Sequence, residues 1–108
     1  MSHDLYLEID TGSDCLTTVV DIGNYTSNVS GMWAKALGER LSEFDGRNAG
    51  DSVPQLDQAI ADMQANRADY EAMNPDNGWG RYGGALEYLR TLRDGCARHP
   101  KTVIRVSC

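Results

Sequence analysis

The sequence predicts an α+β protein in which a small three-stranded, mostly antiparallel sheet is covered on one face by three helices. Two observations predict this class. Segments near both ends of the chain alternate apolar and polar residues, and three segments between them repeat apolar residues every three or four positions. The resulting ββαααβ order gives each element one apolar face, which two packed layers would bury. The length of 108 residues predicts a single domain spanning residues 1–108.

Three strands are expected from alternation and from β-branched residues. The first is expected at residues 4–10, where alternate positions are apolar: Leu5, Leu7 and Ile9. Turn residues follow, and the β-branched run at residues 16–22 predicts a hairpin partner. The third strand is expected at residues 102–108, beside the first or the second strand.

The first helix is expected at residues 29–41, where apolar residues recur at helical spacing from Val29 to Leu41. Phe44 would close this helix. Residues 45–51 have the composition of a loop.

The second helix is expected to begin at Ser52, which opens a capping-box pattern with Pro54 in the first turn. Two continuations remain open, since residues 65–73 either prolong this helix or form a short new helix capped by Asn66. Pro75 ends it in both cases.

The third helix carries its apolar stripe at spacings of three and four residues. The stripe consists of Leu86, Leu89, Leu92 and Cys96. Arginines lie mostly on the other side of this helix, and Pro100 terminates it.

The charge is acidic overall but unevenly distributed. The net charge of −6 disfavours binding to nucleic acid, because the protein would repel the phosphate backbone. Residues 81–108 nevertheless carry six bases and two acids, a net charge of +4. This excess is either a solvated helix face that balances the acidic remainder or a basic patch for an anionic partner.

Several features predict a cytoplasmic protein without a membrane partner. The N-terminal residues form neither a basic nor a hydrophobic segment, and no run of eighteen apolar residues occurs. The three cysteines, Cys15, Cys96 and Cys108, lack metal-ligand spacing, and in a reducing compartment they would be free thiols.

Two polar, aromatic segments precede helices, at residues 23–33 and 74–84. One hypothesis makes them helix entrances, in which Thr26, Asn28 or Ser30 caps the first helix, and Asn74, Asp76 or Asn77 organises the turn that leads to the third. The other hypothesis makes them a binding cleft at one rim of the sheet. Its residues would be Asn24, Tyr25, Asn28, Asn77, Trp79, Arg81 and Tyr82.

Such a cleft would suit a nucleotide-like or sugar-like ligand, because amides, aromatic faces and one cation would converge in it. The glycine-rich residues 78–84 form neither the sequence pattern of a phosphate-binding loop nor a dinucleotide-binding fingerprint. No catalytic residue, metal site or cofactor is predicted. His3 is expected at a mobile terminus, and Asp21 is the one carboxylate that a small hydrolase could use as a base.

The segments DIGNYTSNVSGMW, NPDNGWGRYGGALEYLRTLRDGCARHP and VIRVS together resemble a set of small uncharacterised proteins of actinobacteria and their phages. The likeness covers nearly the whole chain and implies no established activity. It implies a phage or actinobacterial accessory protein whose partner is a host protein. The sequence therefore predicts a non-enzymatic binding protein; the alternatives are a small-ligand binding protein and a small hydrolase, and a homodimer is left open.

Overall fold

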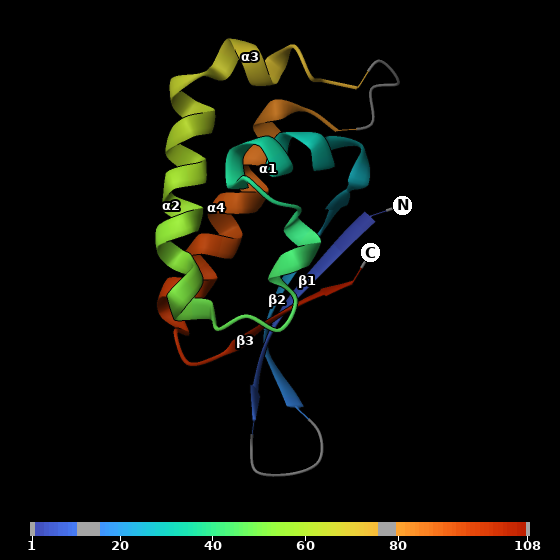
Figure 1. The fold of residues 1–108 in the computed structure, drawn as a ribbon. Coiled ribbons are helices and arrows are strands. Elements are labelled where there is room, and N and C mark those ends of the chain that lie inside the picture. Colours follow the sequence, from blue (N-terminus) through green and yellow to red (C-terminus); the bar gives the residue numbers. More distant parts are fainter. Residues whose placement is uncertain (1, 11–15, 76–79, 108) are drawn as a thin grey trace.

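The chain folds into a sheet with helices on one side, as Figure 1 shows for the computed structural model, which describes residues 2–10, 16–75 and 80–107. Within these ranges, two strands are followed by a helical region and a final strand. The predicted α+β class and the ββαααβ order are confirmed, with one additional short helix and two 3-10 turns.

The sheet contains β1 (Ser2–Asp10), β2 (Leu16–Thr26) and β3 (Val103–Ser107) in the order β2-β1-β3. Both pairings are antiparallel. β3 lies beside β1, which is one of the two neighbours that the sequence analysis allowed for it. The β1–β2 register shifts twice, and Gly23 near the first shift has a φ of 101°, which glycine adopts readily.

β2 is longer than predicted and continues to Thr26 instead of ending at residue 22. Asn24 pairs with Asp4, and Tyr25 pairs with His3. The start of the first polar segment is therefore strand, which corrects the interpretation of these residues as a helix entrance. The physical reason is that β1 begins early enough to pair with them.

The inward face of β1 packs against the helices. Leu5 and Leu7 are completely buried, as the alternation predicts, and His3 on the same face is also buried. The expectation that His3 lies at a mobile terminus is therefore wrong. Ile9 is 39% exposed because the β1–β2 hairpin extends beyond the helices (Figure 1).

The first helix is shorter than predicted. α1 (Ser30–Leu37) ends at Gly38, whose φ of 79° is a left-handed helix cap. Leu41 and Phe44 belong to a separate 3-10 turn, η2 (Leu41–Phe44). Both side chains remain buried, so the predicted apolar stripe is correct although the continuous helix is wrong.

The second helix, α2 (Ala49–Ala65), begins before Ser52, which corrects both the predicted loop and the predicted capping box. Asn48 is the cap, since its side chain accepts the Asp51 N–H at 2.9 Å. Ser52 lies inside the helix and donates its hydroxyl to the Asn48 carbonyl. A bridge between Asn48 and Val103 fixes where the helix starts.

A short helix, α3 (Arg67–Glu71), restarts after Asn66, as one of the two predicted continuations has it. The Asn66 side chain does not cap this helix. Its amide instead donates to the Asp62 carboxylate at 2.9 Å, which ties the turn back to α2.

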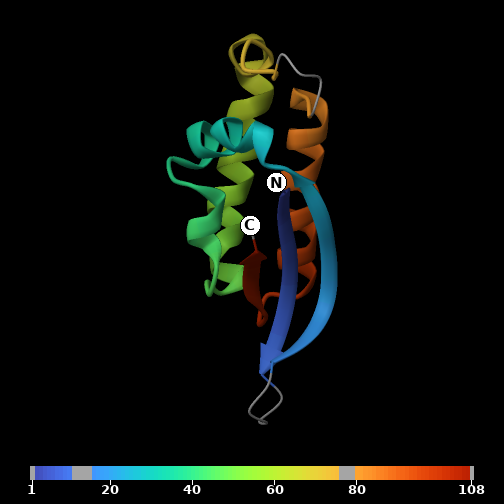
Figure 2. The same ribbon diagram turned by 90° about the vertical axis from the view of Figure 1, so that its right-hand side faces the viewer.

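α4 (Tyr82–Arg98) is the helix that lies across β1 and β2, whereas α2 packs mainly on α4 and α1 (Figures 1 and 2). Gly95 permits this close approach, since a Cβ there would lie 2.8 Å from the Cδ1 atom of Ile22. Leu89, Leu92 and Cys96 are buried as predicted, and Leu86 is partly buried.

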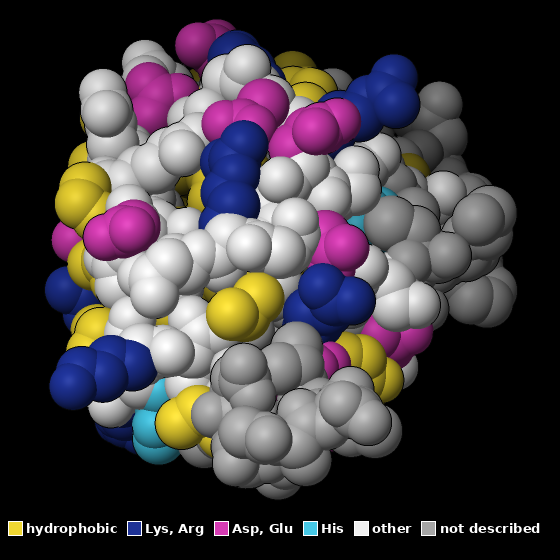
Figure 3. Space-filling view, turned by 60° about the horizontal axis from the view of Figure 1, so that its bottom comes forward, with side chains coloured by type: hydrophobic (Ala, Val, Ile, Leu, Met, Phe, Trp, Pro, Cys, Tyr) yellow, Lys and Arg dark blue, Asp and Glu magenta, His cyan; other side chains and the backbone are white. Residues whose placement is uncertain are grey.

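Three of the six bases at residues 81–108 form ion pairs with described acids: Arg90, Arg93 and Arg105. Arg93 contacts Asp57 at 2.6 Å, and Arg105 contacts Asp45 at 3.7 Å. Figure 3 shows Lys and Arg side chains interspersed with Asp and Glu side chains on the face that it displays. This arrangement favours the solvated, balanced surface over a basic patch. Among the described residues, no helix combines the length and apolar character needed to cross a bilayer.

Candidate functional site

The two polar segments meet where β2 ends and α4 begins, a region we call the β2–α4 junction. A Cβ on Gly80 would lie 2.5 Å from the Thr26 methyl group and 2.9 Å from the Val29 side chain. The backbone N–H of Arg81 donates to the Tyr25 hydroxyl at 3.1 Å. Of the predicted binding residues, five are at this junction, and Asn77 and Trp79 lie outside the described residues.

Tyr25 joins the sheet to the start of α4. Its ring lies 6.3 Å from the Trp33 ring and 6.0 Å from the Tyr88 ring. A Cβ on Gly84 would overlap the Tyr25 hydroxyl, so glycine at this position is what allows the tyrosine to reach Arg81. These contacts give Tyr25 a structural role.

Tyr82 is buried and also has a structural role. Its hydroxyl donates to the Met63 carbonyl at 2.7 Å, which ties α4 to α2. The guanidinium of Arg67 lies over its ring, 5.4 Å from the centroid. The ring face is therefore already occupied by a cation of the same chain.

Asn24, Asn28 and Arg81 are exposed at the junction. Among the described residues, no side-chain hydrogen bond caps α1, which corrects the prediction that Thr26, Asn28 or Ser30 does so. The chain enters α1 through a 3-10 turn, η1 (Ser27–Val29), and the Thr26 hydroxyl accepts the Asn28 N–H at 3.3 Å within that entry.

Asn74 organises the start of α4 and is one of the three residues that the helix-entrance hypothesis offered for this turn; Asp76 and Asn77 lie outside the described residues. The Asn74 side-chain oxygen accepts the N–H of Tyr82, the first residue of the helix, at 2.8 Å. The Tyr25 hydroxyl satisfies the preceding N–H, that of Arg81. Two side chains distant in sequence thus supply the acceptors that a local cap usually provides.

Replacing Asn74 by Ala is expected to lower the free energy of unfolding by about 1 kcal/mol, because the Tyr82 N–H loses its acceptor. Urea denaturation followed by circular dichroism would measure this change. Asn28→Ala is the matched control, since Asn28 is exposed and should change stability by less than about 0.5 kcal/mol. Equal losses in both variants would contradict the role of Asn74.

A cluster of rings lies beneath the junction. The fully buried Trp33 donates its indole N–H to the Ala85 carbonyl at 3.1 Å. His3 meets Trp33 edge to face at 5.3 Å. The Tyr88 hydroxyl lies 2.8 Å from the His3 carbonyl and 3.0 Å from that of Gly23, and thereby holds α4 to both strands. Sequence reasoning missed Tyr88, although its helical spacing placed it near the apolar stripe.

The surroundings of Cys96, His3 and Asp21 indicate structural roles for these three titratable side chains. Burial raises the pKa of the Cys96 thiol to about 12, so this thiol stays protonated and is a poor nucleophile at neutral pH. Burial lowers the pKa of His3 and outweighs the nearby Asp4 carboxylate, which acts in the opposite direction. Asp21 is exposed and accepts the Gly23 N–H at 2.8 Å. Within the described ranges, no three His, Cys, Asp or Glu side chains form a metal-binding group.

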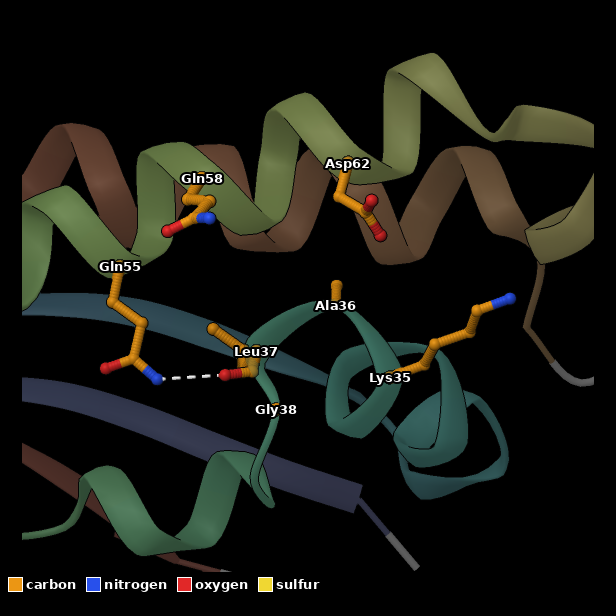
Figure 4. A pocket seen from close by; sticks show the side chains of 7 residues that line it. All are labelled: Lys35, Ala36, Leu37, Gly38, Gln55, Gln58 and Asp62. Atoms are coloured by element: carbon orange, nitrogen blue, oxygen red, sulfur yellow. Dashed lines mark hydrogen bonds between the residues drawn. The ribbon is translucent and has the colours of Figure 1, made fainter.

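One pocket lies between α1 and α2 and has a volume of about 330 Å³ (Figure 4). It is lined by Lys35, Ala36, Leu37, Gly38, Gln55, Gln58 and Asp62. Gln55 donates to the Leu37 carbonyl at 3.0 Å, and the Lys35 amino group lies over the Tyr70 ring. The Asp62 carboxylate accepts from Asn66 and Tyr70, so three polar groups of the pocket are already engaged within the protein.

A second pocket, of about 410 Å³, lies between the start of β1, α1 and η2, and we call it the β1–α1–η2 pocket. It is lined by His3, Ser30, Gly31, Ala34, Arg40, Leu41 and Ser42. Of the predicted binding residues that the structure describes, none lines either pocket, and Asp21 lines neither. The residues that line these two pockets therefore differ from those of the cleft that the sequence predicted.

The two outer edges of the sheet differ. Along β3, the segment before α2 covers the edge, because Gly46 donates to the Ile104 carbonyl and Ile104 donates to the Arg47 carbonyl, both at 2.8 Å. The Asp45 carboxylate accepts the Val106 N–H at 2.9 Å. Along β2, by contrast, no described strand pairs with the outer side.

The described residues form a small α+β protein in which one sheet edge is covered and the other is paired with no strand. No protein-family model matches the chain, and comparisons with curated proteins and with solved structures give no match either.

Proposed function

We propose that this protein is a non-enzymatic binding protein that holds an extended segment of a host protein as an added strand along β2. The observation that carries this proposal is the contrast between the two sheet edges: among the described residues, the chain covers the edge of β3 and places no strand along the outer side of β2. An open edge presents unpaired N–H and C=O groups to a partner. Strand addition uses those groups for affinity and alternate side chains for specificity.

The composition of β2 supports the proposal. The strand has 11 residues and contains one charged residue, Asp21, with neither lysine nor proline. Exposed edges in other proteins are commonly protected by lysine, proline or short length. A long, β-branched edge without these features is suited to pairing with another chain.

The charges favour a basic partner segment over a second copy of this chain. Asp21 is exposed, and Asp4 on the neighbouring strand alternates with the buried His3 and Leu5, so it points away from the helices. Arg105, the base on β3, is already close to Glu8 and Asp45. Antiparallel pairing of two β2 strands near their middle would bring the Asp21 carboxylates together, which is unfavourable.

The resemblance to small proteins of actinobacteria and their phages supports the biological part of the proposal. The protein acts in the cytoplasm as an accessory protein, and its target is a host protein with a basic, extended segment. No reaction is part of this role.

Peptide display against the intact protein tests the proposal. Random peptides selected on the protein are expected to be extended sequences with Lys or Arg at alternate positions. Hydrogen exchange of the protein with a selected synthetic peptide should then slow at alternate amides of β2 (Leu16–Thr26). Asp21→Asn keeps an acceptor for the Gly23 N–H and should weaken binding up to about fivefold.

Asp69→Asn in α3 is the matched control, because it removes the same charge at an exposed position away from the sheet. It should leave binding unchanged. The proposal fails if the slowed amides lie outside β2 or if both variants weaken binding equally. It also fails if the protein is a dimer in which β2 is already protected without peptide.

A further inference from the structure

The β1–α1–η2 pocket combines one cation, hydroxyl groups and a small apolar wall. Its polar side chains are those of Arg40, Ser30, Ser42 and His3. Its apolar wall consists of Gly31, Ala34 and Leu41. The volume of about 410 Å³ falls within the range of small-molecule sites, roughly 300–1,000 Å³.

Arg40 is exposed and supplies the cation of this pocket. Within the part of the chain that the structure describes, Arg40 makes no ion pair, whereas Arg47, Arg67 and Arg93 each contact a carboxylate. The adjacent acid, Glu39, is turned to other partners: it accepts from Arg47 at 3.1 Å and from Gln55 at 2.9 Å. These hydrogen bonds lower the pKa of Glu39 and keep it ionised in its pair with Arg47.

The remaining lining adds donors and no acid. No acidic residue lies in the first turn of α1, which forms one wall, and no Asp or Glu is among the described residues that line the pocket. The hydroxyls of Ser30 and Ser42 can donate to an anion. His3 is buried with its ring against Trp33, and burial lowers its pKa, so at neutral pH it is an uncharged hydrogen-bonding group.

We infer that the β1–α1–η2 pocket binds a small organic anion, whose carboxylate or phosphate group contacts Arg40 and the two serine hydroxyls while its apolar body lies against Ala34 and Leu41. A guanidinium offers paired donors that match the oxygens of either anionic group. This site goes beyond the proposed strand addition and does not depend on it, because β2 contributes no residue to the pocket.

Titration of the isotope-labelled protein with phenyl phosphate, benzoate and benzyl alcohol, followed by NMR, tests the site. The two anions distinguish phosphate from carboxylate recognition, and the alcohol tests the apolar body alone. Saturable shifts are expected for the amides of residues 30–34 and 40–42 with at least one anion and not with the alcohol. Arg40→Gln should weaken that binding about tenfold or more, since a charge-assisted contact is lost.

Arg98→Gln is the matched control, because Arg98 is an exposed arginine in the last turn of α4 and does not line the pocket. Unchanged binding in this variant supports the site. The inference is overturned if neither anion gives saturable shifts, if the shifts map to other elements, or if benzyl alcohol binds as tightly as the anions. Equal weakening by the two arginine variants would also overturn it, since it would indicate a general effect of charge.

Discussion

Replacing Trp33 by Ala is expected to lower the free energy of unfolding by about 3–5 kcal/mol, the largest loss that we predict for a single side chain. Trp33 is completely buried, bonds to the Ala85 carbonyl and contacts the rings of His3, Tyr25 and Tyr88. Its removal would leave a cavity where β1, β2 and α4 meet. Urea denaturation followed by far-ultraviolet circular dichroism measures the loss without relying on tryptophan fluorescence.

Trp33→Phe is the conservative comparison, because phenylalanine retains a ring in the cluster while losing the indole N–H. It should cost about 1–3 kcal/mol, less than the alanine variant. A loss below about 1 kcal/mol for Trp33→Ala would mean that the cluster repacks without its central ring.

Local patterns in the sequence were sufficient to predict the strands of the sheet and the buried faces of the helices. The alternation around Leu5 and Leu7 placed the first strand, and the spacing of Leu89 and Leu92 placed the buried face of α4. The break at Gly38 was not predicted, because the apolar spacing continues through Leu41 even though the helix does not. A buried stripe can be continuous in space while the backbone that carries it changes direction.

The start of α2 shows why a capping pattern can mislead. The sequence around Ser52 satisfies the local pattern, but tertiary contacts select Asn48 as the cap. The Ala49 N–H donates to the Thr102 carbonyl, and Asn48 bridges to Val103. These long-range contacts fix the helix start three residues earlier.

The candidate site could be predicted only in part from the sequence. The sequence predicted that the two polar segments meet, and Tyr25 and Arg81 do so. It did not predict that Tyr82 would be buried against α2, since an aromatic residue at a helix start fits both a core and a ligand site. The open β2 edge and the pocket around Arg40 depend on how distant segments return to the sheet, which no local pattern encodes.

Replacing Gly80 by Ala is expected to lower the free energy of unfolding by about 2–5 kcal/mol, because two penalties act at the same residue. Gly80 has a φ of 100°, which strains any residue with a Cβ. The added Cβ would also lie 2.5 Å from Thr26 and 2.9 Å from Val29, so the end of β2 and the entry to α1 would have to shift. Urea denaturation measures the loss, and hydrogen exchange at Tyr25 and Arg81 should show that the β2–α4 junction opens first.

Gly83→Ala is the matched control for this prediction. Gly83 lies in the first turn of α4 with no positive φ, and a Cβ there would meet no heavy atom within 4 Å. Because alanine favours helix over glycine, this variant should keep or raise stability, by up to about 1 kcal/mol. Opposite signs for two Gly→Ala changes three residues apart would mean that the contact between the polar segments, and not glycine content as such, holds the junction together. Similar effects of both changes would contradict the close approach of Gly80 to β2.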